Sequence, residues 1–281
     1  MGASAYASSG SARARAGGLG RLSGRGLALH GWRAEAVLFW LAFVAYQGAR
    51  GLGRGSVEDA LAHADQVLGA ERAIGIDIEG SVQGALLGTP WLSALDWVYL
   101  AAQSVALAAG IVLVYRAARP VYRLLRTTLL TTWLLALPVY VLYATAPPRL
   151  AGLGITDSVS ENTPIVLSCG STTALYNPYA AVPSLHAGFA LALGVAVLVS
   201  ARSLPVRIAG ALWGPLVILA TVATGNHFLI DIAAGLLLTG VGLGVALLLR
   251  RRGERDERDS VRGSASRHRD DRRTPAAEAP R

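Results

Sequence analysis

Three short polar motifs stand at the ends of long apolar runs in this 281-residue chain. They are TAPPRL with Arg149, AVPSLHAG with Ser184 and His186, and TGNHFLIDIAAG with Asn226, His227 and Asp231. A histidine or a carboxylate inside an apolar run is costly unless it has a partner or a use. The three motifs therefore predict one site, provided that the fold brings them together.

His227 and Asp231 are four residues apart, so a helix places both on one face. The carboxylate can then hold the imidazole in one tautomer, as an oriented nucleophile or base requires. His186 lies on another apolar run and is expected to give a proton to a leaving group. These three residues are the predicted catalytic group.

The remaining polar residues suit a phosphate ligand. Arg149 carries a permanent charge on a fork that matches phosphate oxygens, and Ser184 can donate its hydroxyl. Asn226, Tyr176 and Asn177 complete the predicted substrate-binding group. Arg149 has a second interpretation, as an anchor of its span at the membrane interface.

The starts of two apolar runs, near 185 and 228, offer backbone N–H groups with no partner inside a helix. Such helix N-termini bind anions, and Pro183 suits a helix start. We therefore expect a phosphate cradle at both. Two histidines and a carboxylate are also a conceivable metal ligand set. The positive charge of Arg149 opposes a cation, so no metal and no cofactor are expected.

Composition describes the elements that must position these residues. With 53% hydrophobic and 16% charged residues, the chain reads as an integral membrane protein. The predicted fold is an all-α, polytopic six-helix bundle with spans at about 34–49, 91–115, 127–146, 185–201, 208–224 and 228–249. The first run is the shortest, and its alternative is a re-entrant or interfacial segment.

The segments between and outside these spans differ in character. The stretch between spans one and two mixes acidic and apolar residues at helical spacing, which predicts a short amphipathic helical segment at the membrane surface. Residues 1–33 predict a disordered basic leader, 34–250 the membrane domain, and 251–281 a disordered charged tail.

Arginines set the predicted orientation, because cytoplasmic loops collect them. If both termini are cytoplasmic, only Arg50, Arg54, Arg72 and Arg149 of the 26 basic residues lie outside. All three motifs then face the extracytoplasmic side of the cell membrane. Topology thus explains the net charge of +8, and no nucleic-acid partner is expected. The absence of lysine fits a GC-rich bacterial genome.

At these motifs the sequence resembles the type-2 phosphatidic acid phosphatase superfamily, from roughly residue 90 to 245. APPR around Arg149 and NPYAAVPSLHAG are similar to its branch of inositolphosphotransferases and inositol phosphorylceramide synthases. The resemblance implies that His227, oriented by Asp231, attacks phosphorus to give a phosphohistidine, and that His186 protonates the departing oxygen. It also implies six helices, metal-independent chemistry and a lipid-linked phosphate substrate.

The chain departs from the superfamily pattern at two cationic positions, where Leu142 replaces a lysine and Thr221 a second arginine. The expected function is a membrane lipid phosphatase or phosphotransferase at the outer leaflet, acting on a lipid phosphate or a polyprenyl- or inositol-type phospholipid. Whether water or an alcohol is the acceptor stays open. The alternative is a lipid-phosphate binding or transport protein without catalysis.

Overall fold

The computed structural model describes residues 31–52, 56–167 and 178–271. The described residues divide into a helical body that ends at Leu249 and a second unit that begins at Arg250. Within the described ranges the secondary structure is helical, and extended pairing is limited to an isolated bridge between Thr145 and Ala180. The predicted all-α class is therefore confirmed for the described residues.

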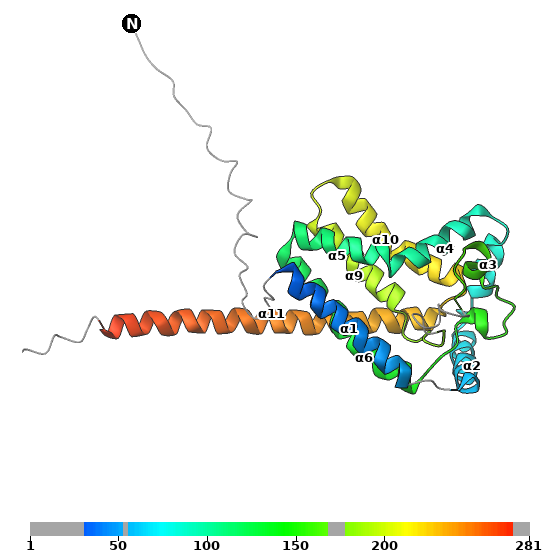
Figure 1. Ribbon diagram of the computed structural model, residues 1–281, viewed down its shortest axis with the longest axis horizontal. Helices are drawn as coiled ribbons and strands as arrows, with labels where there is room; N and C mark the ends of the chain where they lie inside the picture. Colours follow the sequence, from blue (N-terminus) through cyan, green and yellow to red (C-terminus); the bar gives the residue numbers. More distant parts are fainter. Residues whose placement is uncertain (1–30, 53–55, 168–177, 272–281) are drawn as a thin grey trace, which may run out of the picture. The chain divides into compact units, whose positions relative to one another are not determined.

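The helices follow one another along the chain (Figure 1). They are α1 (Trp32–Leu52), α2 (Val57–Ile74), α3 (Glu79–Leu86), α4 (Pro90–Ala102), α5 (Val105–Ala117), α6 (Arg119–Leu142), η2 (Pro148–Leu150), α7 (Ser158–Asn162), α9 (Leu185–Ser200), α10 (Leu204–Ala223) and α11 (Leu229–Asp271).

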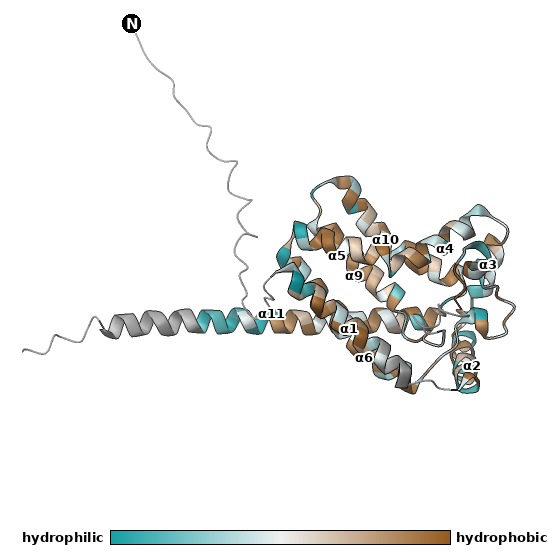
Figure 2. Cartoon of the chain, in the orientation of Figure 1, coloured by the Kyte–Doolittle hydropathy of each residue, from teal (hydrophilic) through white to brown (hydrophobic). Residues whose placement is uncertain are grey.

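Among the described residues, three helices are long and apolar enough to cross a membrane: α6, α10 and the part of α11 from Leu229 to Asp259. The bent pair α4 and α5 makes up to four if it counts as one span. Apolar residues run along these elements, and α11 changes from apolar to polar along its length (Figure 2). α9 is apolar but has 16 residues, and α1 does not have the apolarity of a span. The six-span bundle stays a prediction.

The predicted second span, 91–115, is broken in the structure. α4 and α5 meet at 54°, and Gln103 and Ser104 occupy the break. The Ser104 hydroxyl donates a hydrogen bond of 2.6 Å to the Leu100 carbonyl, where it competes with the helical N–H groups. A local side-chain contact thus accompanies the bend, and it could not be recognised from hydropathy.

α9 packs against α10, α5 and α6 (Figure 1). α9 and α10 cross with almost no side-chain volume between them. A Cβ on Gly194 would lie 2.5 Å from the Gly210 carbonyl oxygen, and one on Gly210 would lie 2.8 Å from that of Gly194. Only glycine permits this approach, which holds the middle of α9 directly against α10.

The amphipathic segment expected before the second span consists of α2 and α3. Ser56 and Asp59 form a capping box at the start of α2. The apolar face of α2 includes Ala60 and Val67, which belong to a core cluster with Phe228. The Ala60 carbonyl also accepts the Ala146 N–H at 2.9 Å. α2 therefore packs against the chain just before Arg149 and just after His227.

The described part of the tail belongs to α11. α11 continues to Asp271, so residues 251–271 are helical, with an ion pair of 2.8 Å between Arg250 and Glu254. This i,i+4 pair is of the kind that supports an exposed helix. The leader up to residue 30 and the end from residue 272 lie outside the described residues.

Candidate active site

The three polar motifs meet where α9 and α11 begin. The Ser184 N–H donates to the Asp231 carbonyl oxygen at 2.9 Å, which ties the second motif to the third. The Arg149 N–H donates to the Gly225 carbonyl oxygen at 3.0 Å, which ties the first motif to the third. Backbone hydrogen bonds thus bring together residues that are 47 and 76 positions apart in the sequence.

His227 and Asp231 form the predicted pair, but His227 lies just before α11 and Asp231 lies in its first turn, so they do not share a helical face. Nδ1 of His227 lies 3.5 Å from Oδ2 of Asp231 and 3.0 Å from the Ala181 carbonyl oxygen. Both neighbours accept hydrogen bonds, so Nδ1 carries the proton and a neutral imidazole keeps its lone pair on Nε2. This tautomer is the one that a nucleophilic Nε2 requires.

Asp231 is fully buried. Its Oδ2 also accepts the Phe228 N–H at 2.9 Å, whereas Oδ1 makes no hydrogen bond to any residue in the described ranges. Burying a carboxylate is costly when one of its two oxygens accepts no hydrogen bond, unless a positive charge develops nearby. A positive charge on the adjacent His227 imidazole would meet this need.

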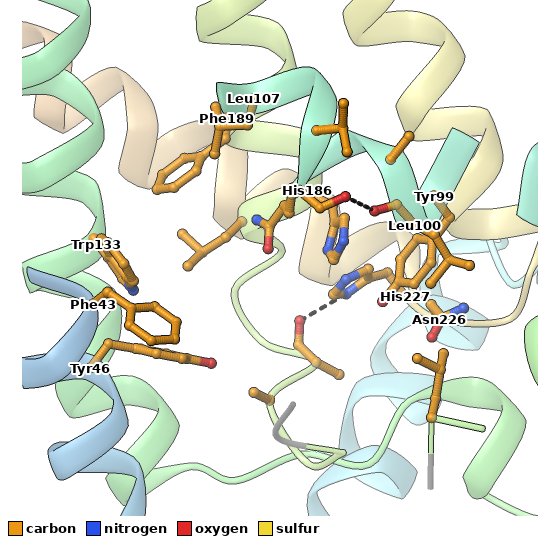
Figure 3. A pocket seen from close by; sticks show the side chains of 18 of the residues that line it. Phe43, Tyr46, Tyr99, Leu100, Leu107, Trp133, His186, Phe189, Asn226 and His227 are labelled. Atoms are coloured by element: carbon orange, nitrogen blue, oxygen red, sulfur yellow. Dashed lines mark hydrogen bonds between the residues drawn. The ribbon is translucent and has the colours of Figure 1, made fainter. Parts of the chain in front are cut away.

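His186 stands in the first turn of α9, and its ring is 5.8 Å from the ring of His227 between centroids. It stacks on Tyr99 of α4 with centroids 4.2 Å apart and planes inclined by 19°. Sequence reasoning missed Tyr99, because an aromatic residue in an apolar span reads as packing. The two histidines lie side by side with Tyr99 in Figure 3.

Arg149 is held inside the body, with a side chain that is 0% exposed. Its Nε donates to Oδ1 of Asn226 at 3.0 Å, and its Nη1 donates to Oδ2 of Asp157 at 3.0 Å. This burial argues against the interfacial-anchor interpretation. Asp157 was not predicted, because it lies in a loop without a motif.

Ser184 caps α9 by accepting the Ala187 N–H on its side-chain oxygen at 3.4 Å. Its backbone is pressed against α11, because a Cβ on Gly235 would lie 2.1 Å from the Ser184 carbonyl oxygen. The serine is buried with 0% exposure. In this arrangement Ser184 orders the start of α9 beside the His227–Asp231 pair.

The start of α11 is not the anion cradle that the sequence predicted. Its first N–H groups already bond to carboxylates: Leu229 donates to Glu79 at 3.0 Å and Ile230 to Glu71 at 2.7 Å. Carboxylates stabilise a helix N-terminus through the helix dipole, and here they occupy the donors that a phosphate would need. The predicted cradle at α11 is therefore wrong.

The pKa of Glu71 is raised to about 8, chiefly by burial and also by the neighbouring carboxylates of Glu79 and Asp231, against the lowering effect of the Ile230 N–H. Glu71 and Glu79 are 0% and 3% exposed. Sequence reasoning missed both, because they are two of six acidic residues on a stretch interpreted as a surface segment.

An apolar cavity of about 640 Å³ opens beside the histidines. His186, His227 and Asn226 line it, together with aromatic and aliphatic residues from α1, α4, α5, α6 and α9. Phe43, Tyr46 and Trp133 group together, away from the two histidines (Figure 3). The site thus joins a pair of imidazoles to a space suited to a hydrocarbon chain.

The structure also places the two positions where the chain lacks a superfamily cation, Leu142 and Thr221, but not all of the predicted binding residues. Tyr176 and Asn177 lie outside the described residues. Leu142 is 79% exposed at the end of α6. Thr221 is buried, and its carbonyl accepts the N–H groups of Asn226 at 3.0 Å and His227 at 3.2 Å. No three His, Cys, Asp or Glu side chains in the described ranges converge as a metal site would require.

A family model described as PAP2 superfamily matches residues 65–245. The matched range runs from α2 into α11 and includes all three motifs. No curated protein and no solved structure matches the chain.

Proposed function

The chain belongs to the PAP2 superfamily, and from this premise we propose that it is a membrane phosphatase or phosphotransferase that cleaves a lipid-linked phosphate ester or anhydride. The family and the apolar helices together support a membrane phosphatase-type protein. The lipid substrate, the phosphohistidine intermediate and the reaction at the outer leaflet are parts of the proposal.

One observation carries the proposal. His186 and His227 line the same apolar cavity, with ring centroids 5.8 Å apart. A phosphate head group between them would meet a nucleophile on one side and a proton donor on the other. The hydrocarbon tail would then lie among residues such as Phe43, Leu107 and Trp133.

The first chemical step forms a bond between phosphorus and Nε2 of His227 and breaks the bond to the leaving oxygen. That oxygen takes a proton from protonated His186. His227 becomes a phosphorylated imidazole with a positive charge, which the carboxylate of Asp231 stabilises through Nδ1–H.

The second step regenerates the enzyme. Water or an alcohol gives its proton to His186 and attacks phosphorus, and the N–P bond breaks. With water the product is free phosphate, and with an alcohol it is a new phosphate ester. An inositol or lipid hydroxyl as acceptor, as in the inositolphosphotransferase branch, is one form of the proposal.

Arg149, Ser184 and Asn226 form the substrate-binding group of the proposal. Asn226 lines the cavity and accepts a hydrogen bond from Arg149, so it links the guanidinium to the place where phosphate would lie. A charge-assisted contact of this kind contributes about 1.5–3 kcal/mol. Tyr176 and Asn177 stay predicted members of this group.

Purified protein should be incubated with a panel of lipid phosphates and scored for free phosphate and for phosphorylated acceptor. His227→Ala is expected to abolish both products. His63→Ala is the matched control, because His63 also bonds a carbonyl through Nδ1, at 2.8 Å to Ala144, yet does not line the cavity. Turnover that survives in His227→Ala would refute the nucleophile.

A non-catalytic lipid-phosphate binding or transport protein is the second candidate. Its support is that Asp157 and Asn226 already engage the Arg149 guanidinium, while Leu142 and Thr221 supply no further cations. Tight binding of lipid phosphate without turnover across the panel would favour it.

A further inference from the structure

Three carboxyl groups from three parts of the chain hold the turn that directly follows His227. Asp231 accepts the Phe228 N–H at 2.9 Å, and the bonds from Leu229 to Glu79 and from Ile230 to Glu71 measure 3.0 and 2.7 Å. The first N–H groups of a helix normally rely on solvent or a single cap. Here each donor has its own acidic side chain.

Glu71 belongs to α2 and Glu79 to α3, so both reach the catalytic helix from the amphipathic segment. Neither forms an ion pair with an arginine in the described ranges. Burying a carboxyl group is unfavourable unless its oxygens accept hydrogen bonds, and the backbone N–H groups at the start of α11 supply them. The two hydrogen bonds therefore fix the backbone of Leu229 and Ile230 at the start of α11.

The groups that face Glu71 are acidic or neutral. They are Glu79 from α3 and, from α11, Asp231 with its partner His227. With its pKa raised to about 8, Glu71 is protonated at neutral pH and keeps one negative charge out of the cluster. Its ionisation would place like charges together beside the His227–Asp231 pair.

We propose that Glu71 and Glu79 are positioning residues for the reaction at His227. They act through the backbone of Ile230 and Leu229, and they fix the first turn of α11 so that Nδ1 of His227 stays on Asp231 and the Ala181 carbonyl. This inference rests on the proposed function. It adds two residues outside the three motifs to the apparatus that orients the nucleophile.

Neither glutamate lines the cavity, so their loss should change the rate of attack more than substrate binding. Small displacements of a reacting group cost about 10- to 100-fold in rate. Glu71→Ala and Glu79→Ala are therefore expected to lower kcat at least about tenfold. The KM for phosphatidic acid in detergent micelles should stay close to that of wild type.

Conservative variants separate positioning from folding. Glu79→Gln and Glu71→Gln keep an oxygen that accepts the same N–H, so they should restore most of kcat at pH 7. Asp96→Ala is the matched control, because Asp96 is equally buried but bonds to Ser158 and Asn162 rather than α11. It should lower thermal stability while leaving kcat unchanged.

A measurement without turnover tests the same inference. In protein labelled with 15N-histidine, His227 of wild type and of the glutamine variants should show a protonated Nδ1 only. The alanine variants should show both tautomers. Unchanged kcat and an unchanged tautomer in both alanine variants would overturn the inference. If wild type turns over no substrate but the tautomer shifts, the hold on His227 stands and the proposed function fails.

If the alanine variants do not fold, the pH dependence of Glu71→Gln decides. Wild type is expected to lose kcat above about pH 8 as Glu71 ionises, and Glu71→Gln should keep it over the same range. The same alkaline loss in both proteins would overturn the role of Glu71.

Discussion

The imidazole of His186 stacks on the phenol ring of Tyr99, with centroids 4.2 Å apart and planes 19° from parallel. The stack fixes the plane of the proposed proton donor from a different helix than its own. We predict that Tyr99→Ala lowers kcat by about tenfold, because His186 then samples other orientations. Tyr99→Phe keeps the ring and should keep the activity.

The choice of substrate makes this measurement specific to proton donation. p-Nitrophenol leaves without much help from an acid, whereas an alkyl alcohol needs a proton. The loss in Tyr99→Ala should therefore be smaller for p-nitrophenyl phosphate than for an alkyl phosphate. Equal losses with both substrates would show that Tyr99 acts on something other than the acid.

Arg149 uses two different nitrogens, Nε on Asn226 and Nη1 on Asp157. A lysine ammonium cannot reproduce this fork. Arg149→Lys is expected to raise KM for a lipid phosphate by about tenfold, the equivalent of one charge-assisted contact. Arg72→Lys is the control, since Arg72 lies near the end of α2 and forms an exposed ion pair with Asp77, which follows the helix. Steady-state kinetics with an unchanged KM in Arg149→Lys would contradict a direct phosphate contact.

Glu71 makes the stability of the protein depend on pH in a defined direction. Between the usual value of 4.5 and the folded pKa of about 8, the folded protein keeps a proton that the unfolded chain releases. Stability therefore falls as pH rises through this window, by up to about 1.4 kcal/mol per pH unit for one proton. Thermal unfolding in detergent should show Glu71→Gln gaining stability relative to wild type from pH 5 to 8. A constant difference between the two proteins would contradict it.

Gly235 sets the distance between the starts of α9 and α11. Gly235→Ala would bring a methyl group to 2.1 Å from the Ser184 carbonyl oxygen, so the helices must separate. We expect a loss of about 1–3 kcal/mol in unfolding free energy and a loss of activity. Gly240→Ala has open space around it and should be neutral or slightly stabilising, by at most about 1 kcal/mol. Similar melting temperatures for the two variants would argue against a close crossing.

The sequence predicted the parts of the site that local spacing controls. His227 and Asp231 are paired as predicted, but His227 precedes α11, so the pair spans the helix start instead of lying along one helical face. The motifs of Arg149, Ser184 and Asn226 converge as predicted. That convergence was inferred from the expected direction of successive spans.

The rest depended on tertiary contacts. Six acidic residues lie between Ser56 and Gly88, and nothing local distinguishes buried Glu71 and Glu79 from the exposed ones. The bend after α4 arises at Ser104 within a continuously apolar run, so hydropathy hides it. The glutamates that accept the first N–H groups of α11 also come from other helices, so local sequence could not identify them.

The break between α4 and α5 contributes to the cavity proposed for the lipid tail, and it is not part of the backbone contacts that hold the reacting groups. Gln103 and Ser104 at the break line the cavity, whereas Ser184 and Asp231, which are joined by a backbone hydrogen bond, do not. Substitutions around the break would reshape the room for a tail and leave the reacting groups in register. Related proteins that differ at the break would then accept different lipid tails and keep the same proposed reaction at phosphorus.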